Sequence, residues 1–188
     1  MKNNIHLFLL ILFAAGPMTA PALYAQGLKN LENNNGFKKY KLGTKYNKVY
    51  GIKNKQEDGS EKVVINYTTD MIGDIPVKQI DLFYISDTLS KIIVRVAPEY
   101  AERLIEACRG SFGNPSVSNG NKNDSTSGNT STDRYIWKTK RFSMEYFYSF
   151  PKYGGANQTR DLHLNYSLND FDRRIGRIKK GNISARDF

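Results

Sequence analysis

The side chains best suited to nucleophilic or acid–base catalysis are scarce in this sequence. Cysteine occurs once, at Cys108, and the single histidine beyond the N-terminal segment is His163. Cys108 falls on the apolar stripe of a predicted helix, where a buried structural thiol is the usual outcome. His163 alternates with Leu162 and Leu164 in a predicted strand, so it is expected to face solvent. A catalytic Cys–His pair would need both residues, and the sequence favours a structural role for each.

Carboxylates offer a second possible chemistry. Asp81 and Glu145 lie on the outer faces of predicted strands and could approach each other across a sheet, but a glycosidase needs two carboxyl groups at a defined separation beside a sugar groove. The sequence has no cluster with zinc-ligand spacing, no Asp-x-Asp-x-Asp-Gly calcium loop and no glycine-rich strand–turn–helix motif for phosphate. We therefore predict no metal and no cofactor. A small envelope hydrolase that uses carboxylates remains an alternative to a non-catalytic role.

Side chains suited to binding lie on the outer face of the predicted sheet. Aromatic and aliphatic residues occur there beside basic ones, a combination typical of protein and glycan interfaces. A face partly covered by the C-terminal tail or by a long polar loop would fit the same pattern. The candidate binding residues are Phe83, Lys91, Ile93, Arg95 and Phe147.

The charge of the chain is strongly positive. It has 28 Lys and Arg against 18 Asp and Glu, a formal net charge of +10. The basic C-terminal tail, residues 168–188, could bind anionic glycans or phospholipid headgroups, although a merely solvated tail is also consistent with it. The sequence has no recognised nucleic-acid-binding motif, so nucleic acid is not an expected partner. The candidate electrostatic residues are Arg173, Arg174, Arg177, Lys179 and Lys180.

The N-terminal segment predicts export. Residues 7–15 form an apolar run of nine residues, whereas a membrane-spanning helix needs about 20. Pro17 and Pro21 follow the run, and small or apolar residues continue to Ala25, as in a cleaved secretory signal peptide. We expect residues 1–25 to be removed near Ala25, with Ala22 as the alternative. The predicted location is the periplasm or exterior of a bacterium, and no later segment is apolar enough to span a membrane.

Hydrophobic periodicity predicts a helix followed by three strands, twice. The first unit, residues 44–96, has a short helix over residues 44–50 and strands at 62–67, 77–85 and 89–96. The second unit, residues 98–167, has a helix that begins at Pro98 and ends at Gly110–Gly113, and strands at 135–139, 142–150 and 162–166. We expect a single α+β domain over residues 44–167, with one antiparallel sheet and helices packed on one face. Residues 26–43 are predicted as a flexible lead-in and residues 114–133 as a mobile loop.

Two short stretches resemble a known family. The run Leu42-Gly43-Thr44-Lys45-Tyr46-Asn47-Lys48-Val49 resembles the helix start of the SmpA/OmlA-like small envelope proteins. The segment from Leu104-Ile105-Glu106 to Phe112-Gly113-Asn114-Pro115 is similar to the helix end of the same fold group. The doubled α-β-β-β order also resembles β-lactamase-inhibitor-protein-like domains, which bind proteins on a concave sheet face. The resemblance covers most of residues 37–167 and implies an envelope module for protein binding or assembly.

Overall fold

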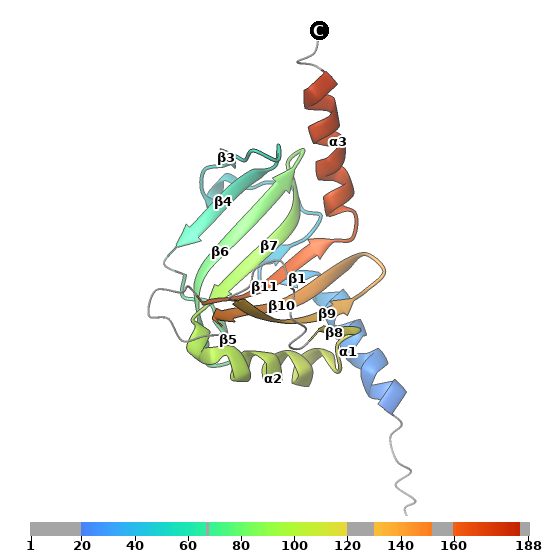
Figure 1. Ribbon diagram of the computed structural model, residues 1–188. Coiled ribbons are helices and arrows are strands. Elements are labelled where there is room, and N and C mark those ends of the chain that lie inside the picture. The colour runs from blue at the N-terminus through green and yellow to red at the C-terminus, as the bar shows by residue number, and fades with distance from the viewer. Residues whose placement is uncertain (1–19, 67, 120–129, 152–159, 185–188) are drawn as a thin grey trace, which may run out of the picture.

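The fold is an antiparallel sheet with helices at both of its faces (Figure 1). The computed structural model describes residues 20–66, 68–119, 130–151 and 160–184. Within these residues the sheet has nine strands in the order β3-β4-β6-β7-β11-β10-β9-β8, and β5 pairs with β6 outside this path. The strands are β3 (Asn54–Lys55), β4 (Glu61–Asn66), β5 (Met71–Ile72), β6 (Ile75–Ile85), β7 (Thr88–Val96), β8 (Val117–Asn119), β9 (Thr130–Lys138), β10 (Phe142–Pro151) and β11 (Asp161–Leu168).

The long strands and the helix that follows β7 confirm the elements that the hydrophobic periodicity predicts. β4, β6 and β7 occupy the three strand positions predicted for the first unit, and β9, β10 and β11 those of the second. The helix α2 (Ala101–Phe112) follows a 3-10 turn, η2 (Pro98–Tyr100), and ends before Gly113. Ser86 and Asp87 join β6 to β7 with φ angles of 48° and 61°. Positive φ at both central residues is the signature of a tight hairpin turn that matches the twist of the strands.

The helix predicted over residues 44–50 is wrong. The structure has only a 3-10 turn there, η1 (Lys48–Tyr50), because the preceding backbone bonds to the β6–β7 turn instead of to itself. The backbone N–H of Tyr46 donates to the carbonyl of Asp87 at 2.8 Å, and that of Leu89 donates to Thr44 at 2.8 Å. Aromatic packing accounts for the spacing of these tyrosines, because the ring of Tyr46 contacts that of Tyr84 and the ring of Tyr50 contacts that of Tyr40.

The predicted flexible lead-in is structured. It contains most of the helix α1 (Ala20–Asn34) and a hairpin of β1 (Gly36–Phe37) and β2 (Tyr40–Lys41). Leu31 is fully buried, and Phe37 and Tyr40 belong to the main core. At Gly27 an added Cβ would lie 2.3 Å from the backbone oxygen of Phe112, so α1 packs directly on α2. The polar asparagines that suggested flexibility end the helix and lead into the hairpin.

The predicted mobile loop and the basic tail also contain regular structure. β8 pairs with β9 through Val117 and Ile136, so residues 117–119 and 130–133 of the predicted mobile loop belong to strands, and residues 120–129 lie outside the described residues. The predicted basic tail forms the helix α3 (Phe171–Ser184). Its apolar residues Phe171 and Ile175 are buried against Ile85. This contact is on the face opposite α1 and α2, so the helices do not all pack on one face as predicted.

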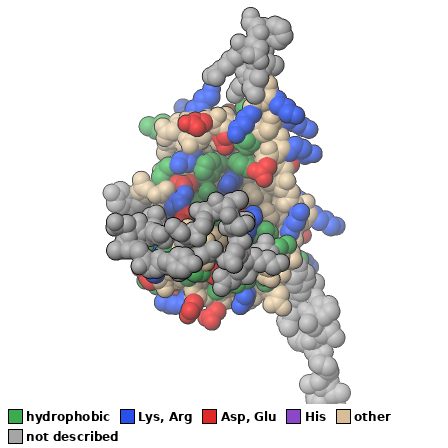
Figure 2. Space-filling view, in the orientation of Figure 1, with side chains coloured by type: hydrophobic (Ala, Val, Ile, Leu, Met, Phe, Trp, Pro, Cys, Tyr) green, Lys and Arg blue, Asp and Glu red, His purple; other side chains and the backbone are tan. Residues whose placement is uncertain are grey.

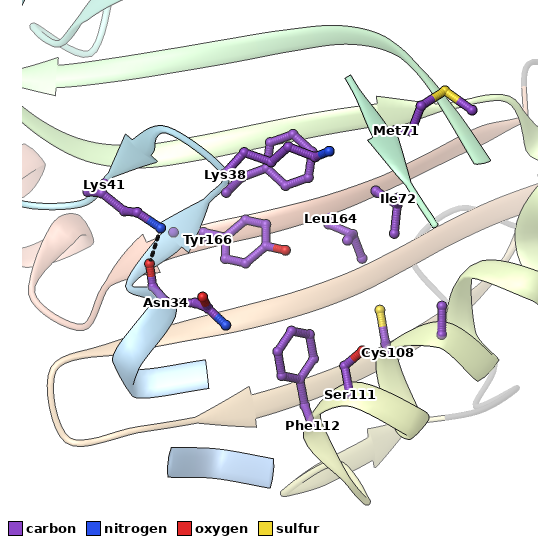
Figure 3. A pocket seen from close by; sticks show the side chains of 13 residues that line it. Asn34, Lys38, Lys41, Met71, Ile72, Cys108, Ser111, Phe112, Leu164 and Tyr166 are labelled. Carbon is purple, nitrogen blue, oxygen red and sulfur yellow. Dashed lines mark hydrogen bonds between the residues drawn. The ribbon is translucent and has the colours of Figure 1, made fainter. Parts of the chain in front are cut away.

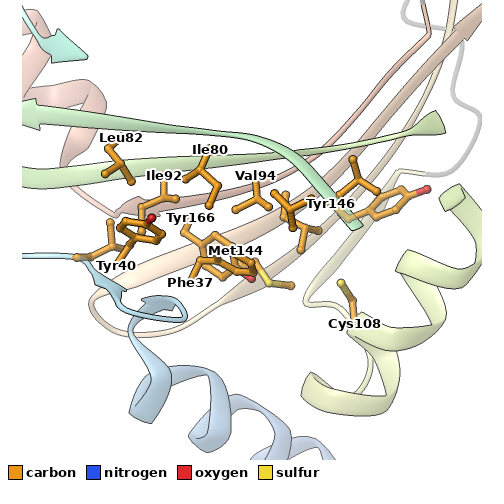
Figure 4. Close-up of a cluster of buried hydrophobic side chains, with 14 of the residues drawn as sticks. Phe37, Tyr40, Ile80, Leu82, Ile92, Val94, Cys108, Met144, Tyr146 and Tyr166 are labelled. Atoms are coloured by element: carbon orange, nitrogen blue, oxygen red, sulfur yellow. The ribbon is translucent and has the colours of Figure 1, made fainter. Parts of the chain in front are cut away.

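The main core lies between the sheet and the layer made by α1, α2 and the β1–β2 hairpin (Figure 4). Alternate residues of the central strands point into it, as period-2 alternation requires. Cys108 projects from α2 into this layer and is 2% exposed, and burial raises the pKa of its thiol to about 12. The structure thus confirms the buried position expected for Cys108. The deeply buried strand residues include Val63, Ile75, Ile80, Leu82, Tyr84, Leu89, Ile92, Val94, Trp137, Phe142, Met144, Tyr146, Leu162, Leu164 and Tyr166.

Candidate functional site

The face of the sheet turned away from α1 and α2 is the first candidate site, and we call it the open face. The β1–β2 hairpin lies behind the sheet in Figure 1, so that view looks onto the open face. Strand register places one residue from each of seven strands side by side in a row across it. This central row, read from β4 to β8, is Val64, Asp81, Ile93, Asn165, Glu145, Ile136 and Val117.

The composition of the central row is unusual for a sheet surface. Outward positions of an antiparallel sheet that faces water are normally polar. Here four of the seven are aliphatic, and Val117 at one end is 45% exposed. Figure 2 shows hydrophobic side chains on this side of the molecule with acidic and basic side chains around them. The row therefore combines apolar area with fixed charges, which is how protein interfaces are commonly built.

An ion-pair network is centred on Arg95. Its Nε and Nη2 atoms both donate to Asp81 Oδ2 at 3.3 Å, and its Nη1 donates to Asp161 Oδ1 at 3.2 Å. The Asp81 side chain is only 1% exposed and also accepts from Gln79 Nε2 at 2.6 Å. Because a buried carboxylate requires compensating charge and hydrogen bonds, Arg95 is held rigidly against the sheet.

His163 extends the network on β11. Its Nδ1 atom lies 3.1 Å from Asp161 Oδ2, and its ring stacks on Phe147 with centroids 4.8 Å apart and planes at 22°. The side chain is 14% exposed, so the predicted outward direction is correct but the expected solvent exposure is not. Desolvation by burial lowers the pKa of His163, against the opposing effect of the Asp161 carboxylate. Arg95 disfavours the protonated ring further, and Glu145 favours it.

This lowered pKa predicts a pH dependence of stability. The unfolded chain takes up a proton near pH 6.5, the usual histidine value, whereas folded His163 takes it up only at lower pH. The contribution of neutral His163 to the free energy of unfolding is therefore complete above about pH 6.5, and it is lost as the pH falls below that value. We expect urea unfolding between pH 5 and 8 to show a decline below pH 6.5 that is smaller in a His163→Gln variant. Equal declines in both proteins would contradict this assignment.

The carboxylates considered for hydrolysis do not form a pair. β7 and β11 lie between β6, which carries Asp81, and β10, which carries Glu145. Three strand spacings of about 4.8 Å put these residues about 14 Å apart, beyond the separation of roughly 5–9.5 Å that glycosidases use. Glu145 is also engaged by Arg134 and by Asn165 Nδ2. The expectation that Asp81 and Glu145 approach each other is wrong.

The five predicted binding residues divide into two groups. Ile93 and Arg95 of β7 and Phe147 of β10 lie on the open face, as their alternation predicted, and β11 runs between these two strands. Phe83 and Lys91 also lie on this face, but at the end where α3 packs: Lys91 Nζ lies 5.7 Å from the ring centroid of Phe83 and 5.3 Å from that of Phe171. The tail thus covers part of the face, which was one of the two readings of the sequence.

The five predicted electrostatic residues of α3 also divide into two groups. Arg173 and Arg174 meet two basic residues of the β9–β10 connection, Lys140 and Arg141, around an open hollow of about 720 Å³, which we call the basic hollow. Asp170 is the acidic residue lining it, and it binds Arg174 at 2.8 Å and Arg173 at 3.6 Å. Hydrogen bonding to Arg174 lowers the pKa of Asp170. Arg177, Lys179 and Lys180 are exposed farther along α3 and do not line the hollow.

Sequence reasoning missed several residues of the open-face network. Gln79, Asp161 and Asn165 are outward residues of strands, and their alternation with apolar neighbours was the available signal. What the sequence does not show is strand order, which brings Asp161 of β11 next to Arg95 of β7. Within the described ranges no group of three or more His, Cys, Asp or Glu is arranged to hold a metal ion. No described helix is long and apolar enough to cross a membrane.

Comparisons with protein-family models, with curated proteins and with solved structures find no match to this chain. The proposals below therefore rest on the geometry and chemistry of the described residues.

Proposed function

We propose that this chain is an exported, non-catalytic binding protein that holds a protein partner on the open face of its sheet. The observation that carries the proposal is the central row, in which four aliphatic side chains lie beside Asp81, Asn165 and Glu145 and the ion pair of Arg95. Rigid strands present these groups without large loss of conformational freedom on binding. The proposed location is the bacterial periplasm or exterior, on the evidence of the N-terminal sequence.

The contact residues follow from what the other described residues leave uncovered on this face. Ile93, Arg95 and Phe147 are retained, and Ile136 and Val117 extend the surface toward β8. Phe83 and Lys91 contribute mainly to the docking of α3. Arg95 is 36% exposed while its ion pairs fix its position, so it can serve as a preorganised anchor for an acidic or carbonyl group.

We also propose that the sheet consists of two related units, as in the envelope and inhibitor-like families that the sequence resembles. The support is the strand order: the last strand of the first triplet, β7, pairs with the last strand of the second, β11, so the triplets meet back to back. The leading elements differ, since the first triplet follows the η1 turn and the second follows α2.

The test uses two substitutions at the β8–β9 end of the central row, where added charge does not enter the core. Val117→Lys with Ile136→Lys should reduce capture of an envelope protein from a bacterial envelope extract at least tenfold, because both place lysines in the apolar part of the interface. Capture is quantified by mass spectrometry and repeated with the purified partner by calorimetry.

The matched control is Val49→Lys with Ile52→Lys. These two aliphatic side chains are 84% and 82% exposed and belong to the loop around η1, which packs on the opposite face through Tyr46 and Tyr84. The control adds the same charge, so it should retain capture. Equal capture by the two double variants, or no saturable partner for the unmodified protein, would overturn the proposal.

A second candidate function is favoured by the basic hollow. Four basic residues and one acidic residue surround a concave space, a shape that suits a chain-like anionic glycan better than a flat membrane surface. Arg141→Gln with Arg173→Gln should weaken binding of a heparin-derived oligosaccharide about tenfold. Arg177→Gln with Lys180→Gln removes the same charge outside the hollow and should change binding little. Equal losses, or binding only to anionic lipid vesicles, would contradict this second candidate.

A further inference from the structure

A pocket on the side of the sheet opposite the open face has the features of a separate ligand site, and we call it the inner pocket. Its volume is about 370 Å³, within the range of roughly 300–1,000 Å³ typical of small-molecule sites. It lies between α2, the end of α1, the β1–β2 hairpin and β5, and the central strand β11 contributes to its lining (Figure 3).

The walls of the inner pocket are mainly apolar. Leu164 lines it from β11, Ile72 from β5, Phe37 from β1, and Cys108 and Phe112 from α2. In Figure 3 the side chains of Leu164, Ile72, Cys108 and Phe112 surround a common space. Apolar walls of this kind stabilise an aliphatic chain in proportion to the area that the chain removes from water.

A tyrosine hydroxyl faces this apolar space. Tyr166 is 4% exposed, and its hydroxyl points into the pocket toward Leu164 (Figure 3). No hydrogen bond joins this hydroxyl to a described residue, and it is not fully enclosed by protein atoms as the unpaired Tyr84 hydroxyl is, so it is open to a group in the pocket. Burial raises the pKa of Tyr166, so the phenol stays protonated and is available as a donor.

The rim of the pocket is positively charged. Lys38 and Lys41 line it, and the described lining residues include no Asp or Glu. Lys41 Nζ donates to the backbone oxygen of Asn34 at 2.7 Å, whereas the exposed Lys38 has no ion pair with a described residue. The lining of the pocket therefore offers a negatively charged group both an ammonium group, from Lys38, and a phenolic donor, from Tyr166.

We propose that the inner pocket binds a small amphiphile with one short aliphatic chain and a carboxylate head group. The chain lies against Leu164, Ile72 and Phe112, and the carboxylate accepts a hydrogen bond from Tyr166 and pairs with Lys38. An alcohol of the same length lacks the charge, and a quaternary ammonium compound carries the wrong one. This site is separate from the open face, so its test does not depend on the protein partner.

The test is calorimetric titration of the purified protein with decanoate, kept below its micelle concentration. Trp137, the only tryptophan of the chain, packs on Phe112 with ring centroids 6.5 Å apart, so its fluorescence gives a second readout of pocket occupancy. We expect saturable binding of decanoate, weaker binding of decanol and none of decyltrimethylammonium. Failure of decanoate to saturate, or equal binding of the three probes, would overturn the proposal.

Two conservative variants locate the head group, each with a matched control. Tyr166→Phe should weaken decanoate binding about tenfold through loss of a hydrogen bond to a charged acceptor. Tyr84→Phe removes a buried hydroxyl that has no partner among the described residues and lies outside the pocket, and it should leave binding unchanged. Lys38→Gln should weaken binding about threefold, whereas Lys39→Gln, one residue along and not in the lining, should not.

A filling variant completes the test. Ala107→Phe places a ring in the pocket from α2 and should abolish binding. Its thermal unfolding is measured first, and if it does not fold, the two tyrosine variants decide the question because each keeps the size and shape of its side chain. Equal loss of binding in the Tyr166 and Tyr84 variants would assign decanoate to another site and overturn the proposal.

Discussion

Replacement of Arg95 by methionine should lower the free energy of unfolding by about 3 kcal/mol, near the lower end of the cost of breaking a buried ion pair. The loss arises because Asp81 is 1% exposed and its buried carboxyl group would lose the guanidinium that compensates it. Arg95 itself is 36% exposed, so water partly replaces it and the cost stays below that of a fully buried pair. Urea denaturation with a constant m-value measures the difference.

Two further variants separate this mechanism from a general loss of surface charge. Arg134→Met removes the partner of Glu145 on the same face, and because Arg134 is 49% exposed the expected cost is at most about 1 kcal/mol. The double variant Asp81→Leu with Arg95→Met removes both charges and should recover most of the stability lost in the single variant. Equal costs for Arg95 and Arg134 would show that Asp81 does not depend on Arg95.

Replacement of Gly36 by alanine should lower the free energy of unfolding by about 3 kcal/mol, since overpacking and backbone strain each cost about 1–3 kcal/mol. Gly36 has φ +137°, and an added Cβ would lie 2.3 Å from the backbone oxygen of Tyr40 in the partner strand of the hairpin. The Tyr40 oxygen is a backbone atom, so it cannot move aside as the end of a flexible side chain could. The hairpin would have to open, and with it the packing of Phe37 in the core.

Gly43 provides the control for this substitution. It also has a positive φ, +85°, but no atom lies within 4 Å of its added Cβ. Gly43→Ala should therefore cost only the conformational penalty, about 1 kcal/mol. Thermal and urea unfolding of the two variants give the comparison. If Gly43→Ala costs as much as Gly36→Ala, the close approach to Tyr40 contributes nothing.

The sequence predicts those elements whose pattern is set by burial on a single face. The alternation along β6, β7 and β10 and the apolar stripe of α2 were visible because each element packs one side against the core. The same alternation placed Ile93, Arg95 and Phe147 on a common face. Side-chain periodicity thus predicts both the strands and the direction of their outward residues.

What the sequence does not predict depends on contacts between distant segments. The stretch around Tyr46 has helical spacing but bonds to the β6–β7 turn, and that backbone pairing decides its conformation. The polar segments that form α1 and α3 owe their order to a few apolar residues, Leu31 in one and Phe171 and Ile175 in the other. Likewise the inner pocket arises where α2, β5 and the β1–β2 hairpin meet, a meeting that no local pattern encodes.

The alternation of β11 has a thermodynamic consequence. Leu164 and Tyr166 line the inner pocket, while His163 and Asn165, the residues next to them in the chain, belong to the open face. A ligand in the pocket that favours one position of β11 therefore also affects the positions of His163 and Asn165 on the open face. By reciprocity, if an occupied pocket changes the affinity of the open face by some factor, a partner on that face changes the affinity of the pocket by the same factor. One strand would then link two ligands that never touch.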